Sequence, residues 1–104
     1  NIALVSRNKD KTQGLAAEIK STYSKVNVLT VSADSTKSAE CRNAFDQIIE
    51  KSSNLGPVDV LCLNAANLGF SGWPPPSFLD AKLDEFEIAL NVGVRGMFIW
   101  SQLV

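Results

Sequence analysis

The chain has 104 residues, enough for one small domain, and we expect residues 1–104 to form a single one. Hydrophobic residues make up 45% of it and the net charge is -1, a balance typical of globular proteins, and no basic stretch is long enough to bind nucleic acid. No histidine is present, which excludes Ser-His-Asp triads, Cys-His dyads and most zinc sites. No segment resembles a signal peptide or a membrane span, so we expect a cytoplasmic protein with no metal, nucleic-acid or membrane partner.

Strand and helix patterns alternate along the chain, which predicts parallel βαβ units with right-handed crossovers. The predicted elements are strands at 2–6, 26–32 and 58–63, and helices at 9–21, 38–52 and from 80 to the end. The third strand is a short apolar run, and we interpret it as buried on both faces. The cysteines fall in the second helix and the third strand, so we expect two reduced core thiols, Cys41 and Cys62. A proline-rich loop at 67–77 either lines a binding site or is a plain solvent loop.

The first predicted strand ends in Ser6, Arg7 and Asn8. In doubly wound sheets the ligand binds at the carboxyl ends of the strands. The planar, permanently charged guanidinium of Arg7 suits a phosphate, and Ser6 and Asn8 supply further donors. The alternative interpretation makes Arg7 a solvated turn residue or a neighbour of the helix dipole.

The other two strand ends carry small and polar residues. Asp34, followed by Ser35, can accept from an adenine amino group, or it can cap the next helix, for which Thr36 is better placed. The third strand ends in Asn64, Ala65 and Ala66. The two alanines are small enough to let a ligand approach the backbone. Asn64 either binds the ligand or only terminates the strand.

Together these stretches resemble the short-chain dehydrogenase/reductase family, an NAD(P)-dependent group with a Rossmann-type fold. The matching segments are 3–8 (ALVSRN), 31–34 (VSAD), 58–66 (VDVLCLNAA) and 96–102 (GMFIWSQ). The third is similar to the family's Asn-Asn-Ala-Gly strand end, with Leu63 in place of the first asparagine and Ala66 in place of the glycine. The resemblance implies a partial doubly wound parallel sheet, β-α-β-α-β-α, lacking the family's first strand and its C-terminal half.

The resemblance also implies function and residue roles. The expected reaction is hydride transfer between a nicotinamide cofactor and a small carbonyl or alcohol, in an enzyme that forms homo-oligomers. Arg7 would hold the 2′-phosphate of NADP, and NAD is less expected because no acid lies beside Ser6. Asp34 and Ser35 would lie at the adenine. The ribose and nicotinamide half would border Asn64, Ala65 and Ala66.

One family position does not match. The family places a supporting asparagine on the helix after this strand, in a pattern like Asn-x-x-Gly-x-Phe, and counting back from Gly96 puts it on Gly93. Asn91 lies two residues earlier, about 200° round an α-helix. Either Asn91 serves after a local kink, or the role is vacant.

Residues 1–104 do not contain the Tyr-x-x-x-Lys motif that the family uses for catalysis. The only tyrosine is Tyr23, with Asn27 where a Tyr-x-x-x-Lys motif needs lysine, and we expect Tyr23 to be a surface or packing residue. We therefore expect a catalytically inactive part of a larger enzyme. Without the family's first strand, residues 58–63 either pair directly with residues 2–6 or stand about 10 Å away, which is two strand spacings.

Two other functions stay open. One is a non-catalytic nucleotide-binding or scaffold relative, favoured by Leu63 and Gly93 at expected asparagine positions. The other is a phosphoacceptor signalling domain with Asp34 as acceptor, although Ser6 and Arg7 offer no acidic cluster beside it.

Overall fold

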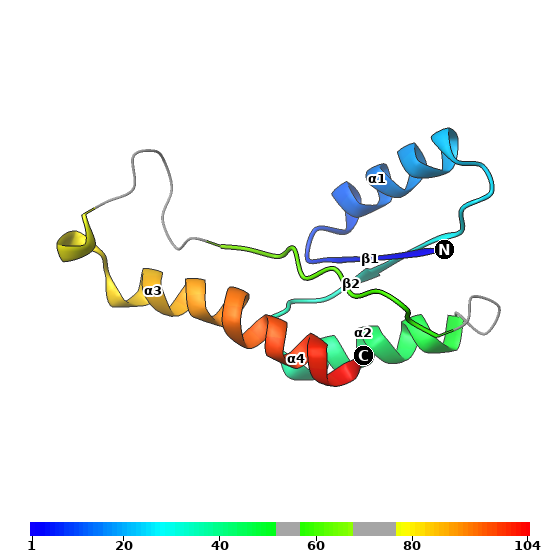
Figure 1. Cartoon of the computed structure of the whole chain (residues 1–104). Coiled ribbons are helices and arrows are strands. Elements are labelled where there is room, and N and C mark those ends of the chain that lie inside the picture. Colours follow the sequence, from blue (N-terminus) through cyan, green and yellow to red (C-terminus); the bar gives the residue numbers. More distant parts are fainter. Residues whose placement is uncertain (52–56, 68–76) are drawn as a thin grey trace.

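The first half of the chain forms the predicted βαβα arrangement (Figure 1). The computed structural model describes residues 1–51, 57–67 and 77–104. β1 (Ile2–Ser6) and β2 (Val28–Ser32) pair in parallel, with Ile2 opposite Val28 and Ser6 opposite Ser32. α1 (Lys9–Thr22) connects them and packs mainly on β2. These elements agree with the sequence prediction, except that β2 begins at Val28 because Val26 donates its N–H to Tyr23 in a turn.

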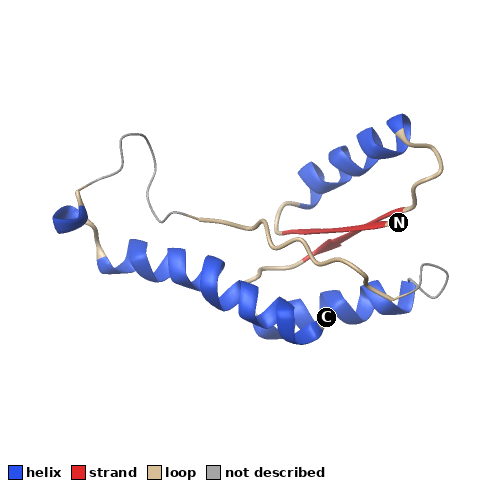
Figure 2. Cartoon of the chain, viewed as in Figure 1, coloured by secondary structure: helices blue, strands red, loops and turns tan. Residues whose placement is uncertain are grey.

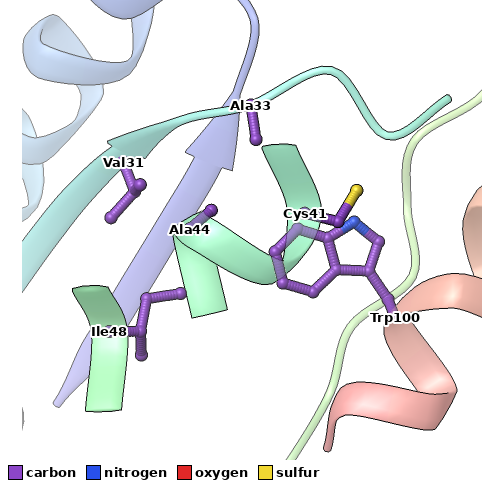
Figure 3. Close-up of a cluster of buried hydrophobic side chains, with 6 residues drawn as sticks. All are labelled: Val31, Ala33, Cys41, Ala44, Ile48 and Trp100. Atoms are coloured by element: carbon purple, nitrogen blue, oxygen red, sulfur yellow. The ribbon is translucent and has the colours of Figure 1, made fainter. Parts of the chain in front are cut away.

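The opposite face of the sheet is covered by α2 (Ser38–Lys51) and α4 (Gly96–Leu103) (Figure 2). Alternate residues of the β2 segment, Val31 and Ala33, face this layer, as period-two alternation requires. They form the core with side chains from the two helices: Cys41, Ala44, Ile48 and Trp100 (Figure 3). The result is an open sheet between two helical layers, which fits a partial Rossmann-like α/β fold.

The C-terminal segment is one long helix with a change of winding in its middle. α3 (Leu83–Leu90) continues through a π-helical segment (Asn91–Arg95) directly into α4. We expected the helix to begin near Asp80, but η1 (Phe78–Asp80) is a separate 3-10 turn capped by the side chain of Ser77. The α-helix itself begins after Lys82, whose N–H donates to the Glu85 side chain at 3.3 Å.

The third predicted strand is not a strand, and the β-α-β-α-β-α pattern is therefore incomplete. The described residues 57–67 are irregular, and the sheet within the described chain contains only β1 and β2. Residues 58–63 thus pair with neither edge of it. Only Val58, Leu61 and Leu63 are half-buried there, while Val60 is 75% exposed.

The irregular conformation of residues 58–63 has a simple physical reason. A strand buried on both faces must have its backbone groups paired, and no neighbouring strand is present in the described chain to pair them. The segment instead packs Leu61 and Leu63 against the core and leaves much of its length exposed. Cys62 is consequently exposed, not buried as predicted, whereas Cys41 is fully buried; both are free thiols.

No helix in the described ranges combines the length and apolar character that crossing a bilayer requires. The proline-rich part of the 67–77 loop, residues 68–76, lies outside the described residues, so its predicted role keeps both interpretations.

Candidate functional site

The ends of β1 and β2 bring Arg7 and the Asp34 turn to one edge of the sheet. The strands are parallel and in register, so both chains leave the sheet at the same level. Two hydrogen bonds join the two exits: Ala33 donates its N–H to the Ser6 carbonyl at 3.4 Å, and the Ser32 hydroxyl donates to the Arg7 carbonyl at 3.4 Å. The first two of the three predicted strand ends therefore lie together.

Arg7 is an exposed cation at this edge. Among the described residues its guanidinium has no hydrogen bond and no ion pair. It lies near enough to Asp34 for its charge to help lower the pKa of that carboxyl. An exposed, uncommitted guanidinium can bind an anion without first breaking an internal ion pair.

Ser6 and Asn8 have local structural roles on either side of Arg7. The Ser6 hydroxyl accepts the Asn8 N–H at 3.3 Å. The Asn8 side-chain oxygen accepts the Lys11 N–H at 2.9 Å and so caps the amino end of α1. For a ligand, the Asn8 side chain thus has its amide nitrogen left as a donor.

Asp34 closes its own turn and does not cap α2. Its Oδ1 accepts both the N–H of Thr36 at 2.9 Å and the Thr36 hydroxyl at 2.8 Å. These two bonds, followed by the charges of Arg7 and Lys37, lower the pKa of Asp34, so the carboxylate is ionised near neutral pH. The Glu40 side chain accepts the Asp34 N–H at 2.9 Å and fixes the turn from the α2 side. The prediction that Thr36 is the better-placed cap is also wrong, because its hydroxyl bonds to Asp34 and α2 begins only at Ser38.

The start of α4 packs on this turn. Trp100 donates its Nε1–H to the Ser35 hydroxyl at 3.4 Å, and Arg95 donates to the Thr36 carbonyl at 3.1 Å. Gly96 is buried, and a Cβ built on it would lie 3.2 Å from the Ser35 carbonyl oxygen. The two hydrogen bonds could not be predicted from the sequence, because partners 59 and 65 residues apart leave no local pattern in the chain.

Asn64, Ala65 and Ala66 are exposed residues of the irregular segment 57–67. In Figure 1 this segment runs in the same direction as the two strands, and its Leu63 packs against the core that contains Ala33. No hydrogen bond among the described residues joins Asn64 to Arg7 or Asp34. The structure thus does not bring residues 64–66 into contact with the ends of β1 and β2, and their cofactor role stays a prediction.

Asn91 and Gly93 both lie in the π-helical segment and are half-buried. The N–H of Gly96 is shared between the carbonyls of these two residues. Such single π turns change the winding of a helix and are frequent at functional sites. A local departure from α geometry is therefore present where the Asn91 alternative requires one, and the role of Asn91 itself stays a prediction.

The remaining candidates lie elsewhere. Tyr23 is the residue that ends α1 and is 62% exposed, which confirms that it is a surface residue. Within the described ranges no group of three or more acidic, cysteine or histidine side chains is placed to hold a metal ion. An open cavity of about 260 Å³ lies between α1 and β2, and none of the predicted site residues lines it.

Comparison with known proteins gives one family. The family model described as short chain dehydrogenase matches residues 1–104, which is the whole chain. No curated protein sequence matches the chain well enough to count as a relative. The match favours the resemblance drawn from the strand ends over the phosphoacceptor alternative.

Proposed function

This chain belongs to the short-chain dehydrogenase family, and on that premise we propose that it forms the adenine-nucleotide side of an NADP-dependent oxidoreductase. The family's general chemistry is oxidoreduction of a small molecule with a nicotinamide nucleotide. NADP preference and the individual residue roles are our proposal. The observation that carries it is the exposed, unpaired guanidinium of Arg7 beside the ionised carboxylate of Asp34.

The residues at the strand ends fit the adenosine half of NADP. Arg7 would hold the 2′-phosphate, with Ser6 and Asn8 as neighbouring donors. Asp34 would accept from the adenine amino group through Oδ2, since Oδ1 is committed to Thr36. Ser35 lies beside it, and Asn64, Ala65 and Ala66 would border the ribose and nicotinamide. When bound, the cofactor supplies or accepts a hydride, while these residues only bind and orient it.

Substitution of Arg7 by aspartate tests the cofactor preference. In the full-length enzyme, Arg7→Asp should lower the ratio of kcat/KM for NADPH to that for NADH by roughly ten- to one-hundred-fold, since a hydrogen bond to a charged group contributes about 1.5–3 kcal/mol. Arg42→Asp is the control, because Arg42 is exposed on α2 and is not one of the proposed cofactor-binding residues. An unchanged NADPH/NADH ratio in Arg7→Asp would remove Arg7 from the site.

We also propose that the 104 residues alone do not catalyse hydride transfer. Hydride transfer to a carbonyl needs a proton donor near the substrate oxygen, and these residues contain no Tyr-x-x-x-Lys motif. Asn91, in its π turn, is the residue that would support such a donor; otherwise the role is vacant. Oxidation of NADPH by the purified 104-residue chain, with any carbonyl substrate, would refute the proposal.

A non-catalytic nucleotide-binding or scaffold relative is the second candidate. Leu63 and Gly93 stand at positions where the family has asparagines, which favours it. Activity of the full-length protein on a panel of carbonyl substrates separates the two functions. NADPH binding without turnover of any substrate would support the scaffold.

The exposed side of the long helix supports the proposal of a homo-oligomer. Large apolar side chains recur along it at helical spacing and are more than half exposed: Leu83, Phe86, Val94 and Phe98. Light scattering of the full-length protein tests this, and a monomer at micromolar concentration would contradict it.

The two free thiols are compatible with the cytoplasmic location that we propose.

A further inference from the structure

The turn that carries Asp34 is contacted by the last residue of the π-helical segment and by α4. Arg95 donates to the Thr36 carbonyl at 3.1 Å, and Trp100 donates to the Ser35 hydroxyl at 3.4 Å. The Gly96 position adds backbone contact, because a Cβ there would be 3.2 Å from the Ser35 carbonyl oxygen and 3.3 Å from its Cβ. Residues 96 and 100 are one helical turn apart, so the two contacts with Ser35 come from one side of the helix.

The contact with Arg95 bears on the orientation of Asp34. Thr36 holds Oδ1 of Asp34 through both its N–H and its hydroxyl. Arg95 holds Thr36 by its carbonyl, on a turn that the Lys37 N–H also closes by donating to the Asp34 carbonyl at 2.9 Å. The residue that holds the Asp34 carboxylate is thus itself bonded to a side chain 59 residues later in the chain.

Arg95 also joins this turn to the π-helical segment, of which it is the last residue. Trp100 is buried in the core, 7% exposed, so the helix cannot slide along the turn without breaking core packing. The Asp34 turn and α4 are thus joined by two hydrogen bonds and by the packing of Trp100 in the core.

We propose that Arg95 is a positioning residue for recognition of the adenine base, acting through Thr36 to aim the carboxylate of Asp34. The proposal rests on the proposed function, since it assumes that Asp34 accepts from the adenine amino group. Arg95 does not touch the nucleotide; it sets the angle at which Asp34 meets the base.

The group at position 6 of the purine base provides a measurement that is specific to the orientation of Asp34. Adenine carries a 6-amino donor, whereas hypoxanthine carries a 6-oxo acceptor that a carboxylate repels. A correctly aimed Asp34 therefore prefers NADPH over reduced nicotinamide hypoxanthine dinucleotide phosphate. Loss of general stability weakens binding of both dinucleotides, but only misdirection of the carboxylate reduces the preference between them.

The experiment measures dissociation constants of both dinucleotides for the full-length enzyme and its variants by fluorescence titration. We expect the wild type to prefer NADPH by about ten-fold or more, the scale of one charge-assisted hydrogen bond. Arg95→Met, which keeps the stem and removes the donors, should bring the preference to within about two-fold. Arg95→Lys, which can still donate to the Thr36 carbonyl, should retain part of it.

Two further variants keep the test sharp. Arg42→Met makes the same change on an exposed arginine of α2 and should keep the wild-type preference. Trp100→Phe removes the Nε1–H donor to Ser35 but keeps a ring in the core, and we expect it to reduce the preference less than Arg95→Met does. Thermal unfolding of each variant shows whether it is folded.

The outcomes separate this inference from the function on which it rests. A wild type that binds neither dinucleotide overturns both. A wild type that binds both equally overturns the role of Asp34, and this inference with it, but leaves the NADP proposal standing. Full preference in folded Arg95→Met, or an equal loss of affinity for both dinucleotides, overturns the positioning role alone.

Discussion

Gly96→Ala tests how tightly α4 is seated on the Asp34 turn. The new Cβ would lie 3.2 Å from the Ser35 carbonyl oxygen, 3.3 Å from the Ser35 Cβ and 3.5 Å from the Asn91 carbonyl oxygen. The Ser35 atoms are not the free ends of flexible side chains, and Trp100 holds the Ser35 hydroxyl. The turn therefore has little freedom to withdraw from an added methyl group.

Two opposing free energies decide the result. Alanine in place of glycine within a helix stabilises the folded state by about 1 kcal/mol. Overpacking a close contact costs about 1–3 kcal/mol. We expect Gly96→Ala to change the free energy of unfolding by between about zero and a loss of 2 kcal/mol.

Gly14→Ala is the matched control, because it lies inside α1 and its added Cβ would meet no atom within 4 Å. It should raise the free energy of unfolding by about 0.5–1 kcal/mol. Urea unfolding of both variants, followed by circular dichroism, isolates the packing contribution as their difference. If Gly96→Ala stabilised the protein as much as Gly14→Ala does, the close packing of α4 against Ser35 would be refuted.

Three further outcomes follow from the described contacts. Asn8→Ala removes the cap of α1 and should lower the free energy of unfolding by about 1 kcal/mol in urea titration. An unchanged free energy of unfolding would show that the Asn8 cap does not stabilise the protein. In the native protein a thiol reagent should modify exposed Cys62 at once and Cys41 only on unfolding, since burial also raises the pKa of Cys41; two rapid equivalents would contradict this. The Asp34 N–H, then Lys37, lowers the pKa of Glu40, so its contribution to stability is present above the ordinary glutamate pKa and is lost as pH falls below about 4.5. Chemical unfolding between pH 3 and 6 should show a smaller pH dependence in Glu40→Gln, and an identical slope would refute the contribution.

The secondary structure of the first half of the chain could be predicted from its sequence. The helices at 9–22 and 38–51 follow from apolar spacing, and β1 and β2 follow from short β-forming runs. The positions of Arg7 and Asp34 at one edge followed as well, because two parallel strands joined by one helix end at the same edge. These features depend on neighbours within a few residues, or on a single crossover, so periodicity is enough to predict them.

The conformation of residues 58–63 depended on tertiary structure. Their apolar run is typical of a buried strand, yet a strand exists only where another backbone supplies hydrogen-bond partners. A one-dimensional pattern gives hydrophobicity but not the presence of a neighbour. The segment accordingly keeps the contacts of Leu61 and Leu63 with the core without forming a ladder.

What the sequence determined by itself is the family, the order β1-α1-β2-α2 and the residues that follow those two strands. What only the tertiary structure decided is how the Asp34 turn is held: by Arg95 and Trp100, from a helix whose π turn shifts its winding just before Gly96. The physical reason is that hydrogen bonds between residues 59 and 65 positions apart arise from the packing of whole elements, which no local spacing encodes.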